Sequence, residues 1–224
     1  MPAGRSPLHY ILRPPSAAPP APPPLLVLLH GYGSHEEDLM GLAPQLDPRF
    51  LVASARAPQE LDLGGFAWFP VEFTPLGLSL RYEEAEAARD QVVALVRALQ
   101  QEHGSVPEQT LLLGFSQGAS MALSAALEHP ELVAGVASLS GLFAKQMLPD
   151  QDPEKLRGLP VLMTHGRDDP LILIGQARKS RDLLARLPVD LTYREYDMGH
   201  EIDWECVLEL RVWLEERLGG APAA

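Results

Sequence analysis

The segment from Thr110 to Ser120 constrains the fold more than any other part of the chain. Apolar residues typical of a buried strand run into Gly-Phe-Ser-Gln-Gly at 114–118, and small, helix-favouring residues follow. This G-x-S-x-G pattern is typical of a sharp strand-to-helix turn, a nucleophile elbow, that holds its serine, here Ser116, strained and exposed. Gly114 and Gly118 suit such a turn, which leaves no room for a Cβ atom. The pattern alone occurs by chance in ~0.07 of such sequences, so the flanking strand and helix strengthen the prediction.

Strand-like and helix-like segments alternate along the chain. Strands are predicted over residues 8–12, 25–29, 50–53, 110–113, 133–139, 160–164 and 191–196. Helices are predicted around 39–43, over 82–102, from the elbow to 128, over 173–187, and at the end of the chain to about 218. Residues 62–80 are expected to be irregular and 142–158 to form a polar loop. The alternation predicts an α/β fold with a mostly parallel central sheet, helices on both faces, and an active site at the carboxyl ends of the strands.

Length and local composition predict a single domain over residues 1–224. A chain of 224 residues is ordinary for one α/β domain. Residues 14–24 contain seven prolines and are expected to form an exposed connector of polyproline character rather than a domain linker. Residues 220–224 are expected to be a disordered tail.

The net charge and the cysteine content indicate which binding partners and which cellular compartment to expect. The net charge of −12 argues against a nucleic acid or an anionic membrane surface as partner. Cys206 is the single cysteine, so no intramolecular disulfide can form, which suits a reducing compartment. No apolar run is long enough for stable membrane insertion and residues 1–13 hold no secretory signal, so a cytoplasmic protein is expected.

No cofactor or metal site is predicted. The chain has no glycine-rich phosphate loop and no dinucleotide fingerprint. The segment His35–Asp38 contains possible metal ligands, but the spacing of Ser34 and Glu37 favours a capping box before a helix. Cys206, Trp204 and Trp213 are interpreted as core residues.

The order of residues along the chain indicates which histidine and which carboxylate could act with a nucleophilic serine. A serine hydroxyl needs a base within hydrogen-bonding reach and an anion that orients the base, in the order Ser, acid, His for a hydrolase elbow. Of the seven histidines, only His200 follows a carboxylate at a strand end. Asp168 and Asp169 both qualify by position as the acid. Asp169 is favoured because Pro170 biases it towards an extended conformation.

Donors for a developing oxyanion are expected from two backbone amides. The usual pair is the N–H after the nucleophile and an N–H from an earlier His-Gly-x-Gly loop. These amides belong to Gln117 and Tyr32. A plain strand-ending turn at His30–Gly31 is compatible with the same role.

Four segments together resemble the phospholipase/carboxylesterase family of α/β-hydrolases, which includes the acyl-protein thioesterases. They are His30–Gly33, Gly114–Gly118, His165–Pro170 and Gly199–His200, and they span nearly the whole chain. The resemblance implies the α/β-hydrolase fold and assigns the acid to Asp169, the aspartate before proline. Bacterial esterases of the family also carry a glycine-rich loop with an aromatic pair, matched at 64–69. Ser34 and Pro70 depart from the family pattern, since many relatives have Asp at these positions.

The acyl pocket is expected to be small and to lack a lid. The 142–158 loop is short and charged, which suits a solvated loop rather than an amphipathic lid. Pocket residues are therefore sought beside the motifs, and the candidates are Trp68, Phe69, Phe115, Leu142, Leu171 and Met198.

These observations predict a serine carboxylesterase that hydrolyses short-to-medium acyl esters by Ser116, His200 and Asp169. An acyl-(protein) thioesterase or a lysophospholipase is the enzymatic alternative. A non-catalytic ligand-binding homologue is the alternative from another class. The expected partner is a small acyl ester, and the oligomeric state is left open, a homodimer included.

Overall fold

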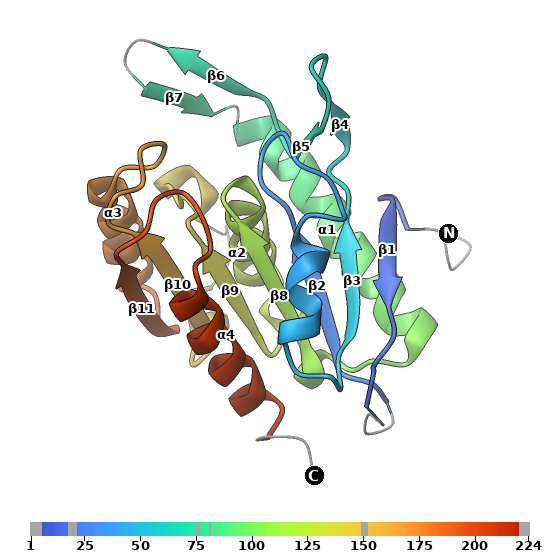
Figure 1. Ribbon diagram of the computed structural model, residues 1–224. Helices are drawn as coiled ribbons and strands as arrows, with labels where there is room; N and C mark the ends of the chain where they lie inside the picture. The colour runs from blue at the N-terminus through green and yellow to red at the C-terminus, as the bar shows by residue number, and fades with distance from the viewer. Residues whose placement is uncertain (1–5, 18–21, 75–76, 81, 149–151, 220–224) are drawn as a thin grey trace.

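Seven strands form one central sheet in the order β1-β3-β2-β8-β9-β10-β11 (Figure 1). The computed structural model describes residues 6–17, 22–74, 77–80, 82–148 and 152–219. The strands are β1 (Tyr10–Arg13), β2 (Leu25–Leu29), β3 (Leu51–Ala55), β8 (Thr110–Phe115), β9 (Gly135–Leu139), β10 (Pro160–Gly166) and β11 (Asp190–Tyr196). Every neighbouring pair is parallel except β1 and β3. The predicted α/β-hydrolase fold with a mostly parallel sheet is confirmed.

Continuous apolar sequence explains the central strands. Every residue of β2, β3 and β9 is buried, as expected for parallel strands covered on both faces. The edge strand β1 is only half-buried and pairs antiparallel with β3. It starts two residues later than predicted, since pairing with β3 begins at Tyr10, and Leu8 is buried just before the strand.

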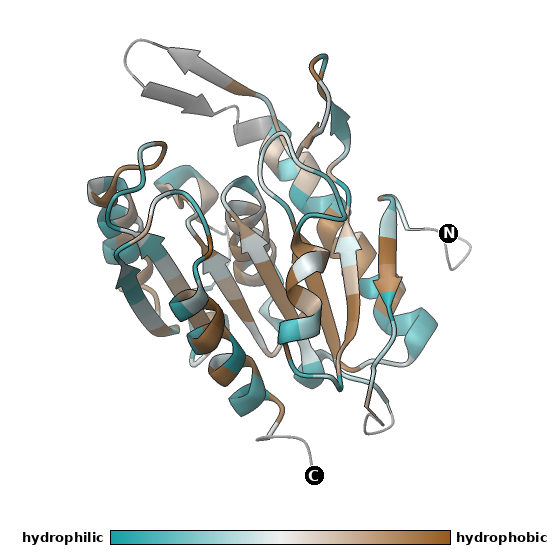
Figure 2. Cartoon of the chain, viewed as in Figure 1, coloured by the Kyte–Doolittle hydropathy of each residue, from teal (hydrophilic) through white to brown (hydrophobic). Residues whose placement is uncertain are grey.

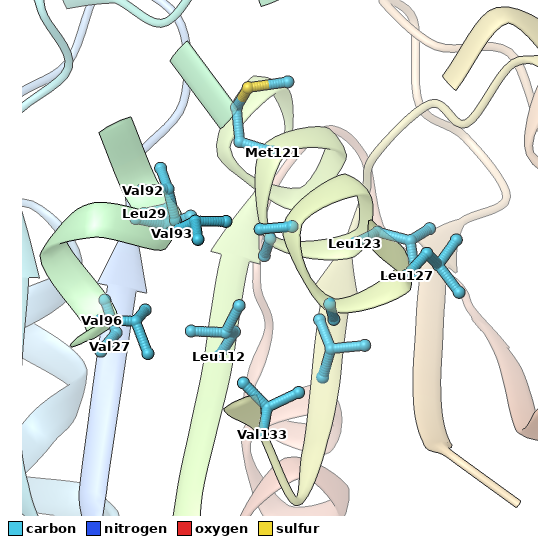
Figure 3. Close-up of a cluster of buried hydrophobic side chains, with 14 of the residues drawn as sticks. Val27, Leu29, Val92, Val93, Val96, Leu112, Met121, Leu123, Leu127 and Val133 are labelled. Atoms are coloured by element: carbon cyan, nitrogen blue, oxygen red, sulfur yellow. The ribbon is translucent and has the colours of Figure 1, made fainter. Parts of the chain in front are cut away.

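Helices cover both faces of the sheet (Figure 1). Apolar side chains of α1 (Tyr82–His103), α2 (Gln117–Glu128) and α3 (Ile174–Leu184) form one core cluster on the face of the sheet to which the odd-numbered residues of β2 point. Figure 3 shows this cluster, in which Val92, Val93 and Val96 lie near Val27 and Leu29. On the other face, α4 (Trp204–Arg217) and a 3-10 helix at Leu39–Gln45 cover the even-numbered residues. Because successive side chains of a strand point to opposite faces, β2 contributes apolar side chains to the core on both sides of the sheet.

Hydropathy follows this layering, with one departure from the sequence prediction. In Figure 2, brown apolar segments concentrate along the central strands, and α4 alternates between brown and teal. Trp213 is buried against the sheet as predicted. Trp204 was predicted to be core and is 62% exposed, because it lies on the outer side of the first turn of α4.

The region before α1 is more ordered than predicted. Residues 62–80 were expected to be irregular, yet β5 (Phe66–Ala67) pairs with β4 (Gln59–Glu60), and β6 (Val71–Thr74) pairs with β7 (Gly77–Leu80). Both hairpins are outside the main sheet (Figure 1). Their strands are too short for a period of two residues to stand out in the sequence.

Several loops also differ in detail from the sequence prediction. The capping box at Ser34 and Glu37 is absent: Asp38 occupies the N-cap position of the 3-10 helix without a side-chain capping hydrogen bond, and its carboxylate accepts a hydrogen bond from the Ser34 hydroxyl. Short 3-10 helices occur at Pro107–Gln109, Pro130–Leu132, Lys145–Met147 and Pro153–Leu156. Part of the proline-rich connector and the tail at 220–224 lie outside the described residues. Among the helices of the described ranges, none is long and apolar enough to cross a membrane.

Candidate active site

The elbow holds Ser116 in a backbone conformation that few residues adopt. Ser116 lies between β8 and α2 with φ 54° and ψ −116°. A Cβ atom on Gly114 would come well under 3.0 Å from the carbonyl oxygen of Gly118, and one on Gly118 would come equally close to the carbonyl oxygen of Leu29. The glycines therefore allow β8, α2 and β2 to meet at this point. The result is a strained, positive-φ serine at the carboxyl edge of the sheet.

A continuous hydrogen-bonded chain joins Ser116 to His200 and Asp169. The Nε2 atom of His200 lies 2.9 Å from Ser116 Oγ, and its Nδ1 atom lies 2.6 Å from Asp169 Oδ2. Because an ionised carboxylate only accepts, Nδ1 carries the proton and Nε2 is free to accept from the serine hydroxyl. Asp169 is 2% exposed, and its Oδ1 accepts from the amides of Leu171 and Ile172 at 2.8 and 2.9 Å.

The two candidate acids are in different environments. Asp168 is exposed, and its backbone amide donates to the carbonyl of Met198. Asp169 is buried and is the one in contact with His200. The structure therefore brings together Ser116, His200 and Asp169 and leaves Asp168 outside.

The loop after β2 places Tyr32 beside the elbow. His30 holds the start of this loop from its interior side: Nδ1 donates to the carbonyl of Gly31 at 2.7 Å, and Nε2 accepts from the amide of Ala57 at 3.0 Å. The indole of Trp68 donates to the carbonyl of His30 at 2.8 Å. Tyr32 and Gln117, the predicted oxyanion-hole residues, both border the same cavity as Ser116.

The glycine-rich loop at 64–65 packs against the loop that follows β2 and fixes its position. The Gly33 amide donates to the carbonyl of Phe66 at 2.9 Å, and the Phe66 amide donates to the carbonyl of Ser34 at 2.8 Å. Gly65 packs so closely that a Cβ atom there would come well under 3.0 Å from the carbonyl oxygen of Gly33.

This contact predicts unequal effects for two neighbouring substitutions. Gly64 and Gly65 both have positive φ, but a Cβ on Gly64 would meet nothing within 4 Å. Gly64→Ala should lower the free energy of unfolding by about 1–2 kcal/mol through backbone strain alone. Gly65→Ala adds overlap with backbone and should lower it by about 3–4 kcal/mol, with a larger loss of kcat. Urea unfolding and ester hydrolysis of both variants check this, and equal effects would contradict the packing role of Gly65.

The side chain of Gln117 has a role that sequence reasoning missed. Its Oε1 accepts from the Trp68 amide at 2.8 Å, and its Nε2 donates to the Phe69 carbonyl at 2.7 Å. Gln117 is 7% exposed, so both polar ends are satisfied by backbone. This side chain fastens the aromatic segment to the elbow. A polar residue between the nucleophile and the second glycine was the only signal for it in the sequence.

His165 lies directly behind Asp169. Its Nε2 donates to the carbonyl of Ile172 at 2.7 Å and lies 3.3 Å from Asp169 Oδ2. Its Nδ1 is buried and has no hydrogen-bond partner among the residues that the structure describes. Chain order excluded His165 as the base, and the structure places it in the core, where it supports the turn at 169–172.

Burial lowers the pKa of both His30 and His165. Each imidazole therefore has a lower pKa in the folded protein than in the unfolded chain, where the pKa is about 6.5. As pH falls below about 6.5, the unfolded chain binds protons that the folded chain does not, so the free energy of unfolding decreases. The slope is at most about 1.4 kcal/mol per pH unit for each histidine.

His30→Gln isolates one of these contributions. Glutamine can accept from the Ala57 amide but does not titrate, so the decrease in unfolding free energy between pH 7 and 5.5 should be smaller than in the wild type. Urea unfolding at several pH values measures the slope. Parallel curves for the two proteins would show that His30 does not contribute.

A cavity of about 320 Å³ opens beside Ser116 and His200. Four of the predicted acyl-pocket residues border it: Phe69, Phe115, Leu142 and Leu171. Two others do not, and their prediction as pocket residues was wrong. Trp68 is fully buried with its indole turned to His30, and Met198 packs in the core on the face covered by α4.

Further lining residues were not predicted from the sequence. They are Ser34, Asp38, Val71, Ser120, Ile172 and Gln176. Ser34, Val71, Ser120 and Ile172 lie within two residues of segments already singled out, whereas Asp38 and Gln176 are farther along the chain and reach the cavity through tertiary packing. The Phe115 ring also packs against His200, with centroids 5.0 Å apart.

Comparisons with known proteins agree with this architecture. The family model for phospholipase/carboxylesterase matches residues 17–217. The chain is 28% identical to acyl-protein thioesterase 1 of Gibberella zeae, covering 84% of this chain and 85% of the relative. It is 28% identical to esterase YpfH of Escherichia coli over 87% of this chain and 82% of the relative. The crystal structure of esterase PE8 superposes with a TM-score of 0.80 at 30% identity, covering 93% of this chain and 98% of the other. The chain therefore belongs to the phospholipase/carboxylesterase family of α/β-hydrolases and is an ester hydrolase of that family.

Proposed function

We propose that the protein is a serine carboxylesterase that works through an acyl-enzyme. The observation that carries the proposal is the hydrogen-bonded chain from Ser116 through His200 to Asp169 at the wall of a cavity. Ser116 Oγ attacks the ester carbonyl while His200 Nε2 takes its proton, and Asp169 stabilises the imidazolium that forms. The amides of Tyr32 and Gln117 donate to the oxyanion.

The second half of the reaction uses the same groups. Collapse of the tetrahedral intermediate breaks the bond to the alcohol oxygen, and His200 returns the proton to that leaving group. Water then enters, loses a proton to His200 and attacks the acyl carbon. Collapse of this second intermediate breaks the bond between the acyl carbon and Ser116 Oγ, and His200 returns its proton to Oγ as the acid leaves. A non-catalytic binder would gain nothing from a strained serine that already donates to a correctly oriented imidazole.

The cavity favours short-to-medium acyl chains. Its volume of about 320 Å³ is at the small end of the range for ligand pockets. The described residues of the 142–158 loop include exposed charged side chains such as Glu154 and Arg157, which pair with each other. Such charges suit a solvated loop rather than an amphipathic lid, so lipid emulsions should be poor substrates.

Acyl chain length gives the test of this substrate range. Each buried methylene should add about 0.8 kcal/mol of binding until the cavity is full. On 4-nitrophenyl esters, kcat/KM should rise from two carbons, peak at about 4–10, and then fall. A maximum at about 16 carbons or beyond would reject the proposed range, because it would require methylenes to go on adding binding energy beyond the chain length that this cavity can bury.

A thioesterase activity is the second candidate, favoured by the match to acyl-protein thioesterase 1. The same acyl transfer serves a thiolate leaving group, so the distinction lies in leaving-group preference. Rates on an oxygen ester and a thioester of the same acyl chain decide it. A higher kcat/KM on the oxygen ester supports the carboxylesterase, and a clear preference for the thioester supports the second candidate.

A further inference from the structure

The acidic segment at 35–38, which is not part of the catalytic chain, divides into two environments. Glu36 is 5% exposed and pairs with the Arg56 guanidinium, whose Nε lies 2.6 Å from Glu36 Oε2. His9 lies 3.4 Å from its other oxygen. The hydrogen bond from Arg56 lowers the pKa of Glu36 to about 2. Glu36 is therefore a neutralised structural ion pair that ties the segment to the end of β3.

Asp38 is in the other environment. Asp38 is exposed to solvent on one side, and it is one of the residues that line the cavity containing Ser116 and His200. The Ser34 hydroxyl, which also borders the cavity, donates to Asp38 Oδ2 at 2.6 Å and orients the carboxylate. Across the described ranges, no lysine, arginine or histidine forms an ion pair with Asp38. Its negative charge is thus oriented and uncompensated.

The remaining cavity wall does not offset this charge. The walls are largely apolar, and no lysine or arginine of the described chain is among the lining residues. His200 must be neutral to act as a base. A charge at the edge of a cleft with low-dielectric walls has a field that water screens less than at an open surface. The Asp38 carboxylate should therefore attract a cationic substrate group in this cavity and repel an anionic one.

We propose that Asp38 is a specificity-determining residue that selects for esters with neutral or cationic substituents and disfavours esters that carry a carboxylate or phosphate. This inference rests on the proposed ester hydrolysis. It names the substrate class more narrowly, since an apolar cavity with one carboxylate suits uncharged acyl chains and ammonium-bearing alcohols. A substrate that carries a free carboxylate near its ester group is repelled by the negative charge of Asp38.

The test compares substrates that differ in charge but not in shape. In the acyl arm, 4-nitrophenyl hemiadipate is compared with 4-nitrophenyl 6-methylheptanoate. In the alcohol arm, butyrylcholine is compared with 3,3-dimethylbutyl butyrate. Asp38→Asn keeps an acceptor for the Ser34 hydroxyl while removing the charge. We expect it to raise the anionic-to-neutral ratio of kcat/KM about 5- to 20-fold and to lower the cationic-to-neutral ratio about 3- to 10-fold.

Glu37→Gln is the matched control. Glu37 is exposed on the same segment and is not a lining residue, so this variant removes the same formal charge away from the cavity. Its ratios should stay within twofold of the wild type. A change confined to one arm of the Asp38→Asn test supports the proposal and places Asp38 beside that part of the substrate.

Two negative results remain distinguishable. Unchanged ratios in both arms, or equal changes in Asp38→Asn and Glu37→Gln, would overturn the role of Asp38. Absence of hydrolysis of every neutral ester by the wild-type protein would instead reject the proposed function.

Discussion

Replacing Ser116 with alanine is expected to lower kcat for ester hydrolysis by about 10⁴- to 10⁶-fold, the range seen when a serine nucleophile is removed from a triad. The reason is that the acyl-enzyme cannot form without the Oγ atom that lies 2.9 Å from His200 Nε2. The initial burst of 4-nitrophenol should disappear along with steady-state turnover. Labelling by an organophosphonate probe should be lost in the same variant.

Ser120→Ala is the control for this experiment. Ser120 also borders the cavity, but its hydroxyl donates to the carbonyl of Leu142 at 2.6 Å rather than to an imidazole. Its replacement should leave the probe reaction at Ser116 in place. Labelling that persists in Ser116→Ala would show that another residue is the nucleophile.

Local signals in the sequence were sufficient for the elbow and the central strands. Gly114, Ser116 and Gly118 stand within five residues of one another, and the strain they produce is visible as the positive φ of Ser116. The apolar run at 25–29 was predicted as a strand with the bounds it has in the structure. The helix predicted over 82–102 differs from α1 by one residue, because acidic residues at its start and Gly104 after its end mark both limits.

Long-range packing determined what could not be predicted. Gln117 and Trp68 are 49 residues apart and meet only because the aromatic segment folds back over the elbow. Asp38 and Gln176 border one cavity although they come from opposite halves of the chain. The sequence supplies no period or spacing for such contacts. For the same reason Trp68 was assigned to the pocket although its indole faces the interior.

Asp169→Asn is expected to lower kcat by up to ~10⁴-fold, by analogy with the same change in serine proteases. An asparagine amide can donate to Nδ1 of His200, which favours the tautomer with its proton on Nε2. That tautomer cannot accept the Ser116 proton, so the geometry survives while the base is lost. A KM that changes much less than kcat would identify the effect as one on the chemical step.

Asp168→Asn separates the role of this carboxylate from general charge effects at the turn. Asp168 is exposed and is held by its backbone amide, which the substitution leaves intact. Its kcat should stay within about threefold of the wild type, as expected for a surface charge that makes no contact with the reacting groups. The two variants remove the same formal charge from adjacent positions, but only Asp169 contacts His200. If Asp168→Asn proved the more damaging change, the assignment of Asp169 as the acid would be wrong, because its 2.6 Å contact with His200 would then have no catalytic consequence.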